Sequence, residues 1–168
     1  AREEVAARLA PYRDKLMVLL QFDGRTPDTN HSLRNADPAQ LRERVIKLLA
    51  ELDVVMQLTM TLSKGVNDHE VGWVIDTAMR HSHIKVVALQ PVTYSGRYEL
   101  NRQPIDRLTV SDVVKHVVQQ AQSRMRPSDF VPIPCSHPNC GWLTLFVRRW
   151  GLNVNVARHI DLEAVMNQ

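Results

Sequence analysis

The sequence lacks the features that mark several large classes of protein. Its 168 residues include only two cysteines, Cys135 and Cys140, which are too few for the disulfide framework of a small secreted protein. No apolar run approaches the ~20 residues that a membrane-spanning helix needs, and no signal peptide is recognisable. Basic clusters are no longer than Arg148-Arg149 and the net charge is only +3, so nucleic acid is not an expected partner. A soluble, intracellular protein is the expectation that remains.

The composition is that of a folded globular chain. Apolar residues make up 44% and charged residues 23%, which excludes general disorder. A single domain of this length buries roughly 70% of the surface of its unfolded chain, so it can form a substantial core. The chain opens without an initiator Met, at Ala1, in what reads as the middle of an amphipathic helix. We therefore expect an N-terminal part of the fold to precede it.

Apolar periodicity predicts three strand–loop–helix units. Runs rich in β-forming residues predict strands over 16–22, 54–62 and 84–90, the first of them buried on both faces because its apolar run is continuous. Helical spacing predicts helices over 39–52, 68–80 and 110–124, and a polar loop to residue 35. The expected helix caps are Asp37 for the first helix, Asn67 with Glu70 for the second, and Thr109 with Asp112 for the third.

These units predict an α/β fold with parallel strands. Consecutive right-handed crossovers of 30–35 residues are the size of a βα barrel unit, and three units make a partial (βα) barrel. After Arg126 the residue pattern changes, because four prolines lie in the segment around both cysteines. The expected organisation is a half-barrel over 1–126 and a cysteine-containing C-terminal extension over 127–168, which ends in a short apolar element from Trp142 to Val147 and a weakly patterned tail.

Polar residues on the predicted strands are the candidate ligand-binding groups. In parallel βα sheets, ligands bind at the carboxyl ends of the strands. The polar side chains placed there are Gln21, Asp23, Gln57, Thr59, Thr61 and Gln90. A buried amide without a partner costs ~1–3 kcal/mol, so these groups either meet a ligand or bond one another inside a barrel. Both alternatives are open from the residues alone.

The segment from Pro134 to Cys140 is the sharpest local feature. Cys135 and Cys140 lie five positions apart on a proline-stiffened loop, with His137 between them, which is compatible with binding of a soft metal. The loop supplies two or three ligands, whereas a closed zinc or iron–sulfur site has four. The alternative is a pair of ordinary thiols beside a surface imidazole. No Ser/His/Asp set, Walker loop or dinucleotide fingerprint is present. His81 and His83 are expected to face solvent.

Several segments, taken in order, resemble a known family. Leu20-Gln21-Phe22-Asp23-Gly24, followed by Leu33-Arg34, resembles the fourth-strand region of radical S-adenosylmethionine enzymes. The turn Lys64-Gly65-Val66-Asn67-Asp68 resembles the one that follows their fifth strand, and Leu89-Gln90-Pro91-Val92 with Ser95-Gly96-Arg97 resembles the sixth strand and its exit. With the segment from Phe130 to Cys140, the combination is similar to the branch of tetraether lipid synthases and archaeal pterin-precursor methylases, over roughly residues 14–147.

The resemblance implies functions for particular residues. Gln21, Asp23, Gln57, Thr59 and Gln90 match positions that contact S-adenosylmethionine, and Cys135 with Cys140 matches a pair that ligates an auxiliary iron–sulfur cluster. The Cys-x3-Cys-x2-Cys loop that holds the radical-forming [4Fe–4S] cluster is nowhere in this chain. The resemblance therefore implies a fragment that is not catalytically competent alone, or a degenerate relative, and the other half of the barrel is an implied partner.

The implied parent enzyme uses a 5′-deoxyadenosyl radical on an unactivated C–H bond of a lipid chain or a pterin precursor, for methylation or C–C bond formation, with an external electron donor. The implied location is the cytoplasm, with a membrane surface as the alternative for a lipid substrate. Two interpretations that assign the chain to other classes of protein stay open. One is a small metal-binding module built on Cys135, His137 and Cys140, and the other is a βα domain that binds a small anionic ligand without radical chemistry.

Overall fold

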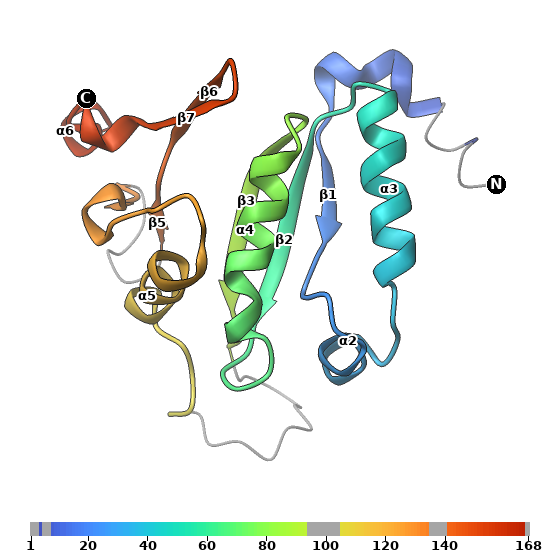
Figure 1. The fold of residues 1–168 in the computed structure, drawn as a ribbon, viewed down its shortest axis with the longest axis horizontal. Helices are drawn as coiled ribbons and strands as arrows, with labels where there is room; N and C mark the ends of the chain where they lie inside the picture. The colour runs from blue at the N-terminus through green and yellow to red at the C-terminus, as the bar shows by residue number, and fades with distance from the viewer. Residues whose placement is uncertain (1–3, 5–7, 94–104, 135–140, 167–168) are drawn as a thin grey trace.

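The structure is a computed structural model that describes residue 4 and residues 8–93, 105–134 and 141–166. A parallel sheet is the centre of the described chain, with helices on one side and short C-terminal elements beyond (Figure 1). The 3₁₀ helix η1 (Ala10–Lys15) leads into β1 (Val18–Gln21), β2 (Met56–Leu62) and β3 (Ile84–Pro91). The strands pair in the order β1-β2-β3 and every pair is parallel, as the sequence predicts. The described residues show a three-stranded sheet and no closed barrel.

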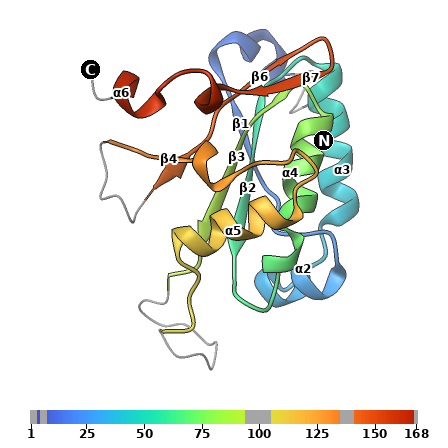
Figure 2. The ribbon, with the colours of Figure 1, turned by 60° about the vertical axis from the view of Figure 1, so that its left-hand side comes forward.

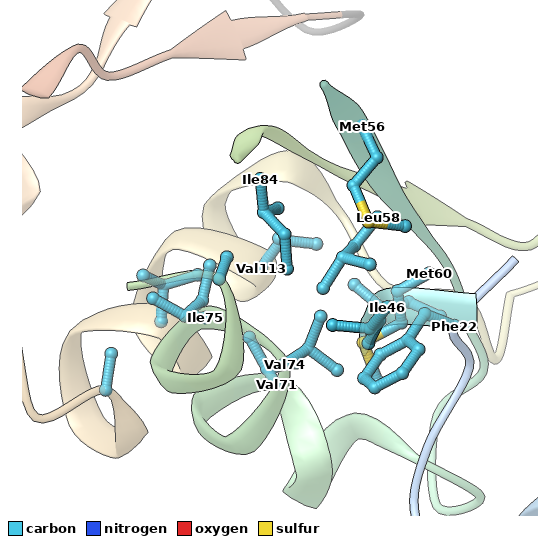
Figure 3. Close-up of a cluster of buried hydrophobic side chains, with 14 of the residues drawn as sticks. Phe22, Ile46, Met56, Leu58, Met60, Val71, Val74, Ile75, Ile84 and Val113 are labelled. Atoms are coloured by element: carbon cyan, nitrogen blue, oxygen red, sulfur yellow. The ribbon is translucent and has the colours of Figure 1, made fainter. Parts of the chain in front are cut away.

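Helices α3 (Ala39–Glu51) and α4 (Val71–Arg80) are the crossovers between these strands. Successive β2 residues alternate between the two faces, and those pointing toward the helices are wholly buried: Met56, Leu58, Met60 and Leu62. They pack with apolar residues of α3, α4 and the β1 end in one core, part of which Figure 3 shows. The helix α5 (Val110–Gln120) packs beside α4, where Gly72 lies so close to it that a Cβ there would be 2.5 Å from the Gln120 carbonyl oxygen.

Two local predictions before α3 are wrong. The segment expected as a loop contains helix α2 (Pro27–Arg34), because the Thr26 side chain accepts a hydrogen bond from the Thr29 amide and Pro27 occupies the first turn. Strand β1 is not buried on both faces, since it is an outer strand of the sheet and Leu19 is 66% exposed.

The three expected caps have different outcomes. Thr109 and Asp112 form the predicted capping box of α5. Asp37 is not the cap residue of α3, which is Pro38, although its carboxylate accepts a hydrogen bond from the Ala39 amide. Asn67 precedes the 3₁₀ turn η2 (Asp68–Glu70) without a side-chain capping bond, so the box with Glu70 is wrong.

The C-terminal part is more ordered than its sequence pattern predicts. After the 3₁₀ turn η3 (Pro127–Asp129) come β4 (Val131–Pro132) and β5 (Trp142–Leu143), which pair antiparallel. Strands β6 (Phe146–Arg149) and β7 (Leu152–Asn155) form a hairpin, followed by η4 (Val156–Arg158) and α6 (Leu162–Met166). Figure 2 shows these elements beyond the sheet. Within the described residues no helix is long and apolar enough to cross a membrane. The boundary expected after residue 126 stays a prediction.

Candidate functional site

The sheet face opposite α3 and α4 is polar along β2. The alternation that buries the methionines and leucines of β2 places Gln57, Thr59 and Thr61 on this other face. Pairing register puts Gln21 of β1 beside Thr59, and Gln90 of β3 beside Thr61. Two apolar residues in register with Gln57 share this face, Leu19 at 66% exposure and Val86 at 38%. The face therefore offers amide, hydroxyl and aliphatic groups together.

Asp23 is the centre of a buried polar cluster directly after β1. Its side chain is fully buried. Arg34 donates from Nε to one carboxylate oxygen at 2.7 Å and from Nη2 to the other at 3.3 Å. Gln21 Nε2 donates at 2.6 Å and the backbone amide of Thr61 at 2.8 Å, while Arg42 Nη2 lies at 3.4 Å. The cluster thus ties the ends of β1 and β2 to helices α2 and α3.

Electrostatics keep this carboxyl group ionised. Burial alone would raise the pKa of Asp23, but the hydrogen bonds from Arg34, the Thr61 amide and Gln21 together hold that pKa below its ordinary value. The hydrogen bond to Asp23 in turn raises the pKa of Arg34, against the effect of burial. A carboxylate held in its charged form is a poor proton donor, so Asp23 is suited to fixing the positions of its neighbours and not to general acid catalysis.

Arg34 and Arg42 are the residues that sequence reasoning missed at this cluster. Arg42 lies on the charged side of the helical pattern over 39–52, yet it is 4% exposed and donates from Nη1 to the Asn30 side chain at 2.6 Å and to the Gly24 carbonyl. Arg34 was part of a motif without an assigned role. Its Nη2 also donates to Thr61 Oγ1 at 2.9 Å, and its side chain is 39% exposed. Of the charged residues in the cluster, Arg34 is therefore the one that reaches solvent, because Asp23 and Arg42 are buried.

Two residues expected as helix caps instead form hydrogen bonds to the segments near the ends of β1 and β2. Asn67 donates to the backbone carbonyls of Asp23 and Thr61, and accepts from the Ser63 amide. The Glu70 carboxylate is 2% exposed and accepts hydrogen bonds from the Arg25 amide and from two threonine hydroxyls at the start of α2. The contact of Asn67 with Asp23 and the contacts of Glu70 span more than forty residues of sequence, which explains why a local pattern did not reveal them.

The structure brings some of the predicted binding residues together. Gln21 bonds both Asp23 and Thr61, at the carboxyl ends of β1 and β2. Gln57 lies near the start of β2, where its amide donates to Thr59 at 3.0 Å, so this pair shares the polar face but not its rim. Gln90 is exposed near the end of β3. Several of these polar side chains therefore bond one another, which was one of the two alternatives left open by the sequence. Their contact with a cofactor stays a prediction.

The predicted metal ligands cannot be placed. Cys135, His137 and Cys140 lie outside the described residues, so the cysteine site stays a prediction. Among residues that the structure does describe, no three His, Cys, Asp or Glu side chains are grouped closely enough to hold a metal ion. The expectation that His83 faces solvent is wrong: it is 8% exposed, and its ring lies edge-on to that of His81, with 5.7 Å between the ring centres.

Comparison with known proteins gives one informative relative. No family model matches the sequence. The chain is similar to a protein of Methanocaldococcus jannaschii named 7,8-dihydro-6-hydroxymethylpterin dimethyltransferase, with 28% identity over 173 aligned positions. The alignment covers 89% of this chain but 34% of that protein. The chain thus spans about a third of the length of the curated relative that it matches.

Proposed function

We propose that this chain is part of a radical S-adenosylmethionine methyltransferase that acts on a pterin precursor. The observation that carries the proposal is the likeness to the named dimethyltransferase along most of the chain. The relative's name favours a pterin over the lipid chain that the sequence motifs also allowed. The parallel order of β1, β2 and β3 supports a place for the chain within a βα barrel.

The polar face of the sheet is where we place S-adenosylmethionine. Gln57, Thr59 and Gln90 supply amide and hydroxyl groups suited to the hydroxyls of a ribose, and exposed Leu19 and Val86 supply apolar surface suited to a purine ring. The donor set on this face thus fits a nucleoside better than it fits a metal ion. When bound with a cluster, this cofactor supplies the radical that attacks an unactivated C–H bond.

The radical-forming cluster does not fit this chain alone. Such a cluster needs a set of cysteine thiolates, and the sequence holds two cysteines that are not in the Cys-x3-Cys-x2-Cys pattern. We therefore propose that the chain alone is not catalytically competent and that the cluster ligands belong to a further part of the protein. In this proposal the described residues hold the binding surface in place. Asp23, Arg34 and Arg42 fix the ends of β1 and β2, beside which the cofactor and substrate would bind.

Binding of S-adenosylhomocysteine to the full-length protein, measured by calorimetry, tests this placement. Gln90→Ala and Gln57→Ala each remove amide hydrogen bonds that are worth about 0.5–1.5 kcal/mol, so each should weaken binding about two- to tenfold. Gln119→Ala, an exposed glutamine on α5, is the matched control and should bind as the parent does. Unchanged affinity in both sheet variants would place the cofactor elsewhere.

A further inference from the structure

Arg34 and Thr61 are hydrogen-bond donors at the carboxyl end of the sheet. Arg34 is the last residue of α2, which lies beside the ends of β1 and β2 in Figure 1, and Thr61 is the last but one residue of β2. The two side chains are joined by a hydrogen bond of 2.9 Å from Arg34 Nη2 to Thr61 Oγ1. In parallel βα sheets this end of the strands is where ligands bind. A donor left free here is therefore available to a ligand.

Within the described residues, two N–H groups of Arg34 have no acceptor. A guanidinium carries five N–H groups, one on Nε and two on each Nη. Nε donates to Asp23, and Nη2 donates to Asp23 and to Thr61, so the two groups of Nη1 remain. The Arg34 side chain is 39% exposed, so a ligand can reach it. Because its other contacts already fix its orientation, it loses little conformational freedom on binding.

The hydroxyl of Thr61 also has a proton to donate. A hydroxyl oxygen can accept two hydrogen bonds and donate one. Thr61 Oγ1 accepts from Gln21 Nε2 at 3.1 Å and from Arg34 Nη2 at 2.9 Å, so both of its lone pairs are used. No atom in the part of the chain that the structure describes accepts its proton. Nη1 and Nη2 belong to one planar group, so the free donors of Arg34 and Thr61 lie close together. The ligand group that fits here is an acceptor.

The positive charge of Arg34 is offset only in part by its neighbours. Asp23 forms ion pairs with both Arg34 and Arg42, so one carboxylate is shared by two guanidinium groups. Asp37 adds negative charge on the side of Arg42, where Asn30 bonds to both of these residues. Since the attraction between two groups grows with their charges, an anion is the acceptor that gains most at Arg34.

We infer that Arg34 and Thr61 bind a phosphate group of a ligand at the carboxyl end of the sheet. The parallel N–H pair with which an arginine holds a planar carboxylate is already engaged with Asp23. The donors that remain are on one nitrogen and one hydroxyl, and they suit separate oxygens of a tetrahedral phosphate. A phosphate ester carries about −1.5 to −2 charges near pH 7, so it gains more from Arg34 than a carboxylate does. Phosphate binding here requires neither methyl transfer nor the position proposed for S-adenosylmethionine.

Calorimetric titration of the full-length protein with inorganic diphosphate tests this site. The parent should bind diphosphate, and Arg34→Gln should weaken binding at least about tenfold, because a hydrogen bond between charged groups is lost. Thr61→Val should weaken it about two- to tenfold, whereas Thr61→Ser keeps the hydroxyl and should bind as the parent does. Arg44→Gln removes an exposed arginine of α3 and is the matched control, with binding unchanged.

Thermal melting of each variant separates loss of the site from loss of the fold. Arg34→Gln also removes donors from the buried Asp23 carboxylate, so the Thr61 variants, which keep every charge, decide the outcome if Arg34→Gln unfolds. A folded parent that does not bind diphosphate, or binding that Thr61→Val leaves intact, would overturn the inference.

Titration with S-adenosylhomocysteine distinguishes a phosphate from the carboxylate of the proposed cofactor. Its affinity should be unchanged in Thr61→Val, and diphosphate should not displace it. An affinity for S-adenosylhomocysteine that falls in Thr61→Val, with diphosphate binding unaffected, would assign the donors to that carboxylate and overturn the phosphate site. Loss of the phosphate site with methyl transfer intact would leave the proposed function standing, so the two can fail separately.

Discussion

The carboxylate of Asp23 and the backbone amide of Thr61 are joined by a hydrogen bond of 2.8 Å. This contact ties Asp23, two residues beyond the end of β1, to the backbone of the neighbouring strand β2. Because Arg34 donates to both Asp23 and Thr61, the same contact sets where a solvent-exposed guanidinium lies. The carboxyl end of the sheet is thus held by a charged network that spans β1, β2, α2 and α3.

Asp23→Asn should strongly destabilise the fold. The substitution leaves Arg42 buried beside a neutral amide, and removal of one partner from a buried ion pair costs about 3–5 kcal/mol. Urea unfolding measures this loss. Asp106→Asn breaks the exposed pair with Lys64 and should change the free energy of unfolding by less than about 1 kcal/mol. Equal, small effects in the two variants would show that the Asp23 network is not what holds the strand ends.

Gly24→Ala should destabilise the loop between β1 and α2. A Cβ at this position would lie 2.7 Å from the Thr29 methyl group and 2.8 Å from a Glu70 carboxylate oxygen, closer than real contacts allow. Overpacking of this kind costs about 1–3 kcal/mol. The free energy of unfolding of the variant measures the loss. Combined Gly24→Ala and Thr29→Ser should recover part of it, because the nearest clashing atom is removed; no recovery would argue against this packing.

Stability should fall as the solution becomes more acidic than about pH 6.5. Burial is the main reason that the pKa of His83 lies below its ordinary value of 6.5, and the charges of His81, Lys85 and Arg148 lower it further, against a hydrogen bond to the Ile46 backbone that raises it. The unfolded chain therefore takes up a proton that the folded chain resists. The stabilising contribution of neutral His83 is fully present above the pKa that this histidine has in the unfolded chain. It is lost as the pH falls toward the lower pKa that it has in the folded chain.

His83→Asn should flatten this pH dependence, measured by urea unfolding from about pH 7.5 to about pH 5.5. Gln119→Asn, which changes an exposed, uncharged residue of α5, is the control and should leave the slope unchanged. His81 contributes in the same direction, because burial and Arg80 lower its pKa, so some slope should remain. A parent protein equally stable at both ends of this range would contradict the assignment.

Much of the fold follows from the sequence, and the exceptions have physical causes. The alternation along β2 and the Thr109–Asp112 box are local patterns, so they predict their structures correctly. Helix α2 had a usable signal in Thr26 followed by Pro27, which is a helix start. The burial of Arg42 had no such signal, because its position in the helical pattern indicates exposure to solvent. Its partners, Asp23 and Asn30, come from another part of the chain.

The cysteine loop should bind metal through its thiols. Cys135→Ala or Cys140→Ala should each reduce the charge-transfer absorption of the full-length protein after anaerobic reconstitution with iron, because each removes a thiolate ligand. His137→Ala should leave that absorption nearly intact. Should both cysteine variants bind as much iron and zinc as the parent, the pair would be ordinary thiols.

Mass spectrometry of the product tests the proposed function most directly. The reconstituted full-length protein, a reductant, 7,8-dihydro-6-hydroxymethylpterin and S-adenosylmethionine with a deuterated methyl group are incubated without oxygen. The proposed function predicts a pterin whose mass rises by labelled methyl groups, and no such product from the 168-residue chain alone, which lacks the cysteine triad. An unchanged pterin from a full-length protein that holds its cluster, or methylated pterin from the chain alone, would contradict it.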